Sequence, residues 1–547
     1  MKRFLLFITF LFFLFGNPLT AQRGKKRDIF THADSLRGSV TPERAWWDVL
    51  YYDIHIRPDY ETRHTSGSNA IRFRVIKRGD NMQIDLQEPL NIRSITWMNK
   101  PLPFTRDSNA YFVHFPKKLK PGNTETVLVN FEGFPKVAAR APWDGGWVFA
   151  KDKLGRPWMT VACEGTGASV WYPCKDYLGD EPDLGASLSI DVPDSLVAVA
   201  NGRQKEKKSN GDGTSTYTWQ VLNPINNYNI IPYIGKYVTW HTDYMGEKGK
   251  LDCDFWVIDY NLDKAKIQFL GVDSMLRCFE FWMGPYPFYE DGYKLVESPH
   301  LGMEHQSAIA YGNKFRQGYE GSDLSGSGWG LKWDFIIVHE SGHEWFGNNI
   351  TAKDIADEWI HESFTNYSET LYTGYYFGKE AADEYNFGTR KRIQNRTPIV
   401  GYYGVNKEPE GTDEYYKGGN MLHTIRQAIN NDSIFRKIWR GLNEKFYHQT
   451  VTARQIETYI SQQANFDFAS VFEQYLRTTQ IPVLAYHLAG DTLRYQWTNC
   501  VSGFNLPVKV NETWIKPTQE WQSKILPSTV GANIHFDRNM YFDSRLQ

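Results

Sequence analysis

Alternating apolar and polar residues dominate the first part of the chain. Residues 51–57 (Tyr-Tyr-Asp-Ile-His-Ile-Arg) and 70–75 (Ala-Ile-Arg-Phe-Arg-Val) alternate with a period of two, and residues 124–131 are rich in β-branched side chains. This pattern is typical of strands that bury one face. Similar short runs continue to about residue 240, and they predict a β-domain of saddle or sandwich type.

The period becomes helical near residue 262. Long apolar-periodic segments are expected to form helices at 264–283, 420–430 and 456–464. A strand is expected at 293–297, and alternation returns at 493–497 and 506–510. The predicted fold class is therefore α+β with several domains, in which a helical domain lies between two β-domains.

The first residues resemble a targeting segment. Lys2 and Arg3 precede a short apolar run from Phe4 to Phe15, and Leu19-Thr20-Ala21-Gln22 resembles a cleavage site after Ala21. The run is too short to cross a bilayer, which favours a removed signal peptide over an uncleaved anchor. We therefore expect a secreted or periplasmic protein with no stable membrane span.

These changes along the 547 residues predict five parts, since the chain is too long for one hydrophobic core. The expected parts are a signal peptide at 1–21, a linker at 22–44, an N-terminal β-domain at 45–245, a helical domain at 246–479 and a small β-sandwich-like domain at 480–547.

Composition excludes some classes of protein. Hydrophobic residues make up 41% and aromatic residues 15%, which is typical of a globular chain. The formal net charge of -2 provides no basic field, so nucleic acid is not an expected partner. The five cysteines do not form a disulfide framework; Cys163 and Cys174 either pair or remain free thiols. The oligomeric state is left open.

The run from His339 to His343 spells H-E-x-x-H after an apolar segment, residues 333–338. On a helix, positions i and i+4 share a face about 6 Å apart along the axis, so two imidazoles can bind one zinc ion. Glu340 then lies beside the metal, where it can act as general base on a water. A chance match on a helix is the alternative interpretation.

A third ligand is predicted in a second amphipathic helix at residues 357–367, where Glu362 follows His343 after 18 residues. Three protein ligands leave a position open for water, which is typical of catalytic zinc sites. His339, His343 and Glu362 are therefore predicted to hold one Zn²⁺ per chain. Asp334 and Asn348 are candidates for supporting the histidines, with capping or surface roles as alternatives.

The residues around these ligands resemble the gluzincin zinc aminopeptidases, the family of aminopeptidase N and leukotriene hydrolase. Residues 338–348 are similar to the family pattern H-E-x-x-H-x-W-F-G-N, and residues 359–364 to W-x-N-E-G-F. The resemblance covers roughly residues 45 to 547. It implies a thermolysin-like zinc domain and an aminopeptidase activity.

Three further segments extend the resemblance to substrate binding. Residues 301–305 are similar to G-x-M-E-N, which implies that Gly302, Met303, Glu304 and His305 bind substrate, with Glu304 on the free amino group. Residues 415–418 are similar to Y-x-K-G, which implies that Tyr415 stabilises the oxyanion. Residues 162–164 and 173–176 resemble the segment that reaches over the active site, which implies that Glu164 is a second amine-binding carboxylate.

The charges fit these implied roles. A peptide N-terminus is a cation near neutral pH, and two carboxylates can hold it by charge-assisted hydrogen bonds. Holding the amine also fixes the distance to the first peptide bond, which indicates an exopeptidase. The expected function is hydrolysis of the N-terminal peptide bond of peptides through zinc-activated water, with Glu340 and Tyr415 as catalytic residues.

Four positions depart from the family pattern: Leu301, His305, His361 and Ser363. His305 matters most, because that position flanks the substrate backbone, so the range of substrates is in doubt. A large helical C-terminal domain of many relatives is missing, and a more open site is expected.

Two alternative functions stay open. One is another hydrolase on the same zinc site, such as an epoxide hydrolase or a narrow dipeptidase, and the other is a non-catalytic peptide-binding relative.

Overall fold

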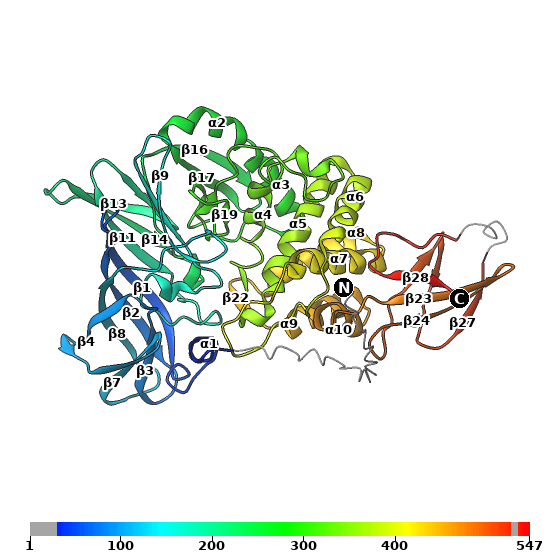
Figure 1. The fold of residues 1–547 in the computed structure, drawn as a ribbon, viewed down its shortest axis with the longest axis horizontal. Helices are drawn as coiled ribbons and strands as arrows, with labels where there is room; N and C mark the ends of the chain where they lie inside the picture. Colours follow the sequence, from blue (N-terminus) through cyan, green and yellow to red (C-terminus); the bar gives the residue numbers. More distant parts are fainter. Residues whose placement is uncertain (1–29, 527–533) are drawn as a thin grey trace, which may run out of the picture.

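The computed structural model describes residues 30–526 and 534–547, and the expected signal peptide at 1–21 lies outside these ranges. Three domains follow one another along the long axis of the molecule (Figure 1). A β-domain comes first, a helical domain occupies the middle, and a smaller β-domain ends the chain. The predicted α+β class is confirmed. No helix in the described ranges combines the length and apolar character needed to span a bilayer.

The N-terminal domain is built on an eight-stranded sheet. The first alternating segments form β1 (Trp47–Pro58) and β2 (Thr65–Val75), which pair antiparallel along their length. In spatial order the strands are β13 (Arg203–Ser209), β14 (Thr214–Val221), β11 (Ala186–Pro193), β1, β2, β8 (Thr124–Gly133), β4 (Asn91–Trp97) and β5 (Lys100–Pro101).

Two smaller sheets complete this domain. One has the order β3 (Gly79–Asp85), β7 (Ala110–Leu119) and β6 (Phe104–Asp107); the other has the order β12 (Val197–Val199), β15 (Tyr233–Gly235), β10 (Pro157–Ala162) and β9 (Gly146–Lys151). Strand β10 ends just before Glu164, so the second sheet fixes where that side chain enters the site.

The end of the expected linker at 22–44 is folded onto this domain. Helix α1 (His32–Gly38) begins at a capping box, in which the Thr31 hydroxyl accepts from Asp34 N. Arg44 is fully buried and forms an ion pair with Asp85. Residues 30–44 are therefore part of the folded body.

The middle domain opens with a five-stranded sheet. Its strands, in spatial order, are β16 (Tyr237–Gly246), β17 (Gly249–Ile258), β18 (Tyr293–Glu297), β20 (Ile309–Tyr311) and β19 (Gly302–Met303). Strand β16 pairs with β17 along its whole length, so this domain begins near residue 237 and not at 246.

The long helix predicted at 264–283 is wrong, because the chain forms α2 (Leu262–Gln268) and α3 (Gly271–Met283) instead. Phe269 lies between them and is buried. Its ring meets that of Tyr311 with centroids 4.8 Å apart. Burial of the Phe269 ring against the sheet thus interrupts the helix at this position.

Helices and a short parallel strand pair build the rest of the middle domain. They are α4 (Phe335–Gly342), β21 (Ile350–Ala352), α5 (Trp359–Phe377), α6 (Lys379–Thr389), α7 (Asp413–Ile429), α8 (Asp432–Lys445), β22 (Gln449–Val451), α9 (Ala453–Ala464) and α10 (Ala469–Arg477).

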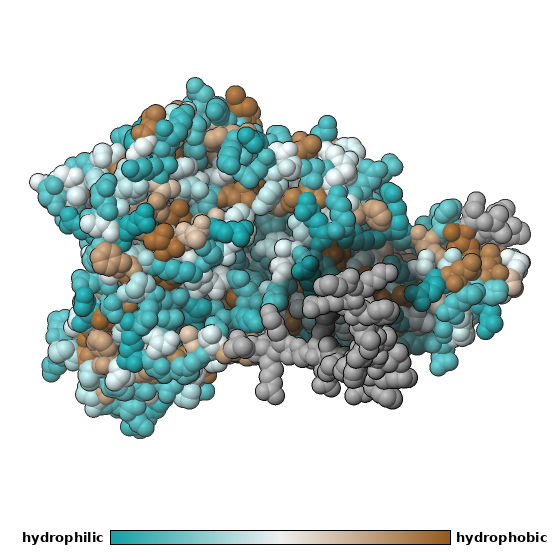
Figure 2. Space-filling view, viewed as in Figure 1, coloured by the Kyte–Doolittle hydropathy of each residue, from teal (hydrophilic) through white to brown (hydrophobic). Residues whose placement is uncertain are grey.

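The C-terminal domain has a four-stranded sheet and a hairpin. The strands are β27 (Gln522–Ile525), β24 (Thr492–Thr498), β23 (Val483–Ala489) and β28 (Asp543–Leu546), with the hairpin β25 (Val508–Val510) and β26 (Thr513–Ile515). One hydrophobic core runs from the middle domain into this domain, while the N-terminal domain has its own core. Figure 2 shows mostly hydrophilic residues on one face, with a group of apolar residues over the C-terminal strands.

Candidate zinc centre and its cavity

Helix α4 carries the candidate ligand His339, and the second candidate, His343, is its C-cap. Its N-cap is Asp334, whose carboxylate accepts hydrogen bonds from Ile336 N at 3.0 Å and Ile337 N at 3.3 Å. Asp334 also accepts from the hydroxyl of Tyr311 at 2.7 Å. This residue therefore caps the helix and anchors it to the sheet, and does not contact the histidines directly.

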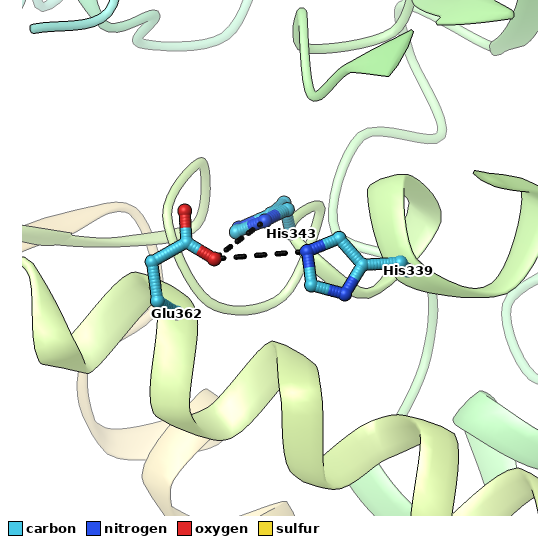
Figure 3. A group of neighbouring side chains, drawn as sticks. All are labelled: His339, His343 and Glu362. Atoms are coloured by element: carbon cyan, nitrogen blue, oxygen red, sulfur yellow. Dashed lines mark ion pairs between the residues drawn. The ribbon is translucent and has the colours of Figure 1, made fainter. Parts of the chain in front are cut away.

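The predicted ligands come together. Nε2 of His339 and Nε2 of His343 lie 3.6 Å and 3.5 Å from Oε2 of Glu362, which α5 contributes (Figure 3). All three side chains are buried, and Glu362 Oε2 has no hydrogen-bond partner among the described residues. Two imidazole nitrogens and one carboxylate oxygen converging on one point fit a zinc ion, which would satisfy that oxygen.

The outer nitrogens of both rings are held by hydrogen bonds. Nδ1 of His339 lies 2.7 Å from Oε1 of Glu369, and Nδ1 of His343 lies 3.1 Å from the carbonyl oxygen of Phe346. Tyr385 in turn donates to Glu369 at 2.6 Å. Such partners turn Nε2 toward the metal position. Sequence reasoning missed Glu369, although it follows Glu362 by two helical turns on α5.

Glu340 faces the cavity beside the ligands. Burial raises its pKa to about 8, and the carboxylates of Glu304 and Glu362 act in the same direction. A Cβ at Gly302 would lie 2.5 Å from Oε1 of Glu340. The glycine of strand β19 therefore provides the space in which this carboxylate lies.

The two predicted amine-binding carboxylates are neighbours. Glu304 is buried, and the hydroxyl of Tyr228 donates to its Oε1 at 2.9 Å. Burial and the negative charge of Glu304 raise the pKa of Glu164 well above its usual value. Oε1 of Glu164 is buried without a hydrogen-bond partner in the described chain. Glu304 and Glu164 together therefore offer the cavity a carboxylate oxygen, Oε1 of Glu164, that still lacks a hydrogen-bond donor.

Residues of the N-terminal domain support this pair. Asn348 donates its Nδ2 to the backbone oxygen of Glu304 at 2.8 Å, and Asn229 donates to Oδ1 of Asn348 at 2.6 Å. The side chain of Asn348 therefore holds the Glu304 segment, while its backbone N donates to the carbonyl oxygen of His343 at 2.9 Å. Tyr228 and Asn229 were not predicted, because their sequence context carries no motif.

Tyr415 lies at the start of α7 against the first ligand. Its ring centroid is 6.0 Å from that of His339, and its side chain faces the cavity. No described residue forms a hydrogen bond with its hydroxyl. Burial raises the pKa of Tyr415 well above its usual value, so the phenol stays protonated and can donate.

Two departures from the family pattern have structural roles. Nε2 of His361 accepts from Ala352 N at 2.8 Å, and the hydroxyl of Ser363 donates to the carbonyl of Glu414 at 2.6 Å. Both side chains are buried outside the metal position. Ser363 also packs on Gly418, where a Cβ would lie 1.8 Å from the serine oxygen. Gly418 thus permits α5 and α7 to approach closely.

His305 does not face the cavity, although it was predicted to bind substrate. Its side chain is fully buried, with Nδ1 2.5 Å from the hydroxyl of Tyr233. That hydroxyl donates to the carbonyl of Ala308 at 2.7 Å, so Nδ1 of His305 is the donor. Burial lowers the pKa of His305 to about 3, which keeps the ring neutral.

The site opens into a cavity of about 570 Å³ between the first two domains. Gly302, Met303 and Glu304 line it together with the metal ligands, Glu340, Glu164 and Tyr415, which gathers all the predicted site residues except His305. Of the two alternatives left open for Cys163 and Cys174, the structure shows the second, since both are buried free thiols.

Profiles of known families match both halves of this site. The Peptidase M1 N-terminal domain matches residues 49–228, and the Peptidase family M1 domain matches residues 302–475. The two ranges together span more than half of the chain. The protein therefore belongs to peptidase family M1, which confirms the resemblance seen in the sequence. The family implies one Zn²⁺ per chain, and the group of His339, His343 and Glu362 has the geometry to hold it.

Individual relatives are distant. Aminopeptidase N of Lactococcus lactis subsp. lactis is 26% identical over 469 residues, which cover 81% of this chain and 52% of the relative. Leukotriene A-4 hydrolase of Xenopus laevis is 21% identical over 447 residues, which cover 77% of this chain and 69% of the relative. The chain thus spans about half the length of the first relative.

Solved structures share the fold. An M1 zinc metallopeptidase variant from Deinococcus radiodurans, bound to a Tyr-Ser-Ala substrate, matches with a TM-score of 0.68 at 19% identity. The match covers 80% of this chain and 96% of that chain. The covered part of this chain therefore has the same fold as that peptidase.

Proposed function

We propose that the protein is a zinc-dependent aminopeptidase, which hydrolyses the N-terminal peptide bond of peptides with a free N-terminus. The observation that carries this proposal is the carboxylate pair Glu304 and Glu164 beside the zinc ligands. An unsatisfied carboxylate oxygen there needs a cationic donor, and a peptide ammonium group supplies one.

The pair also sets the position of cleavage. Glu304, held by Tyr228 at 2.9 Å, fixes the ammonium group at one end of the cavity. The next peptide carbonyl then lies within reach of the metal ligands, because both groups line the same cavity. A peptide bond inside a chain has no ammonium group one residue away, so this contact does not stabilise the binding of an endopeptidase substrate.

Side chains of the chain itself carry the proton transfers. Zinc, when bound, supplies a Lewis acid that polarises the carbonyl and acidifies water. Glu340 accepts the proton of the attacking water and delivers it to the leaving amine. Tyr415 donates a hydrogen bond to the carbonyl oxygen as negative charge develops there.

The test compares aminoacyl chromogenic amides with their N-acetylated forms. Cleavage of the free-amine substrates only, with loss of activity to a chelator and its return on adding zinc, supports the proposal. Equal rates on both forms contradict an amine anchor. A Glu340→Gln variant that keeps zinc but still cleaves at the wild-type rate contradicts the proposed base.

We further propose that the protein is exported, on the basis of the charged start, apolar run and small-residue site within residues 2–22. Export and cleavage after Ala21 are tested by fractionating cells and determining the N-terminus of the mature protein. Recovery of the intact N-terminus from the cytoplasm contradicts this proposal.

A further inference from the structure

Negative charge is concentrated in the cavity. Seven lining residues are glutamates, while the whole chain has a formal net charge of only -2. Arg392 is the one arginine of the described lining, and it donates Nε to the carbonyl of Leu324 at 2.7 Å. A cavity with low-dielectric walls and one sign of charge attracts cations.

The proposed chemistry accounts for part of this charge. Glu362 binds the metal, Glu340 is the base, and Glu304 with Glu164 takes the substrate ammonium group. Glu358, Glu408 and Glu414 line the same cavity and have no function in that scheme.

Glu358 is a buried carboxylate without a partner. Its residue is 8% exposed, and its side chain makes no hydrogen bond or ion pair with any residue of the described ranges. The groups that act on it electrostatically are carboxylates, those of Glu408 and Glu304 among them. A charge buried in this way is costly unless a cation from outside pairs with it.

Glu408 lies over the same end of the cavity. A Cβ at Gly165 would lie 1.2 Å from Oε1 of Glu408, so this carboxylate rests on the backbone next to Glu164. Glu358 also acts electrostatically on Glu164. Glu358 and Glu408 are therefore close to the predicted amine anchor.

We infer that Glu358, assisted by Glu408, binds the cationic side chain of an N-terminal arginine or lysine. The inference rests on the proposed function, and it defines the substrate class as peptides with a basic first residue. In such peptides one residue carries both the ammonium group and the side-chain cation. The two cations are therefore close together, as are the amine anchor and Glu358 with Glu408. Charge-assisted hydrogen bonds would satisfy both buried groups at once.

A second metal ion is disfavoured as the occupant. Three or more ligand atoms within 4.8 Å of one another are found among the described residues in three groups, and neither Glu358 nor Glu408 belongs to any of them. Calcium remains an outcome that the experiment distinguishes.

The test measures binding of free amino acids to the zinc-loaded protein by calorimetry, with L-arginine compared with its neutral isostere L-citrulline. We expect arginine to bind at least tenfold more tightly, and Glu358→Gln to remove most of that ratio. The control is Glu181→Gln, since Glu181 is also 8% exposed but lies outside the cavity lining. Thermal unfolding of each variant checks that it is folded.

Each outcome decides the inference. The inference is overturned if arginine and citrulline bind with equal affinity, or if the ratio of their affinities is unchanged in Glu358→Gln. It is also overturned if one calcium ion binds per chain and competes with arginine. The binding readout needs no turnover. Loss of amidase activity with the arginine preference intact would therefore contradict the proposed function alone, whereas peptide cleavage without the preference would contradict only this inference.

Discussion

Glu369 accepts a hydrogen bond from Nδ1 of His339 at 2.7 Å, two helical turns beyond the metal ligand Glu362. One face of α5 therefore supplies both a zinc ligand and the group that orients another. The same carboxylate accepts from Tyr385 on α6 at 2.6 Å. This arrangement fixes the ring of His339 before metal binds, and it ties the zinc centre to the helix packing around it.

Replacing Glu369 with Gln is predicted to weaken zinc binding. Loss of the negative charge makes His339 a poorer ligand, and partners of this kind contribute about 10- to 100-fold in metal affinity. Competition with a chromogenic chelator measures the change. Glu380→Gln, an exposed position on α6, is the control. Equal zinc affinity in both variants would show that the contact has no role in metal binding.

Tyr415→Phe is predicted to lower kcat by about 100- to 1,000-fold with little change in KM, because the lost hydrogen bond acts on charge that develops only in the transition state. Steady-state kinetics on an aminoacyl amide measures both constants. Tyr416→Phe is the matched control, because its neighbouring ring also lines the cavity. A larger decrease in kcat for Tyr416→Phe would indicate that Tyr416, and not Tyr415, stabilises the oxyanion.

The zinc ligands were predictable because their geometry is local. Two histidines four residues apart need only a helix to meet, and Glu362 needs only a second helix beside it. The same spacing argument, extended by two turns, would have found Glu369. By contrast, strand and helix boundaries depend on packing: the break at Phe269 reflects burial of one ring, which helical periodicity does not encode.

Residues that act through distant contacts were not predictable. Tyr228 comes from the N-terminal domain and meets Glu304 across 76 positions of sequence, with no motif to mark it. His305 was placed in the cavity by resemblance, yet its ring is held by Tyr233. The motif does not encode the direction of this side chain, because that direction depends on a contact with Tyr233 of β15.

Tyr228→Phe is predicted to raise KM for substrates with a free N-terminus. The hydroxyl donates to a charged, buried carboxylate, and such hydrogen bonds contribute about 1.5–3 kcal/mol. The expected increase is therefore about 10- to 100-fold, with a smaller effect on kcat. Tyr286→Phe, which removes a hydroxyl bound to the structural carboxylate Glu344, is the control. Similar KM values in both variants would argue against a role in amine binding.

Gly302→Ala is predicted to lower kcat strongly while the fold persists. The added Cβ would lie 2.5 Å from Oε1 of Glu340 and 2.9 Å from Cδ1 of Ile336, so the base must move away from the attacking water. Misplacement of a reacting group by about 1 Å can cost 100-fold in rate. Gly271→Ala is the matched control, since its Cβ would meet only Cδ1 of Ile337 at 3.9 Å. Zinc content and thermal unfolding should be unchanged in both variants. An active Gly302→Ala enzyme would mean that β19 can move away from Glu340 without lowering kcat.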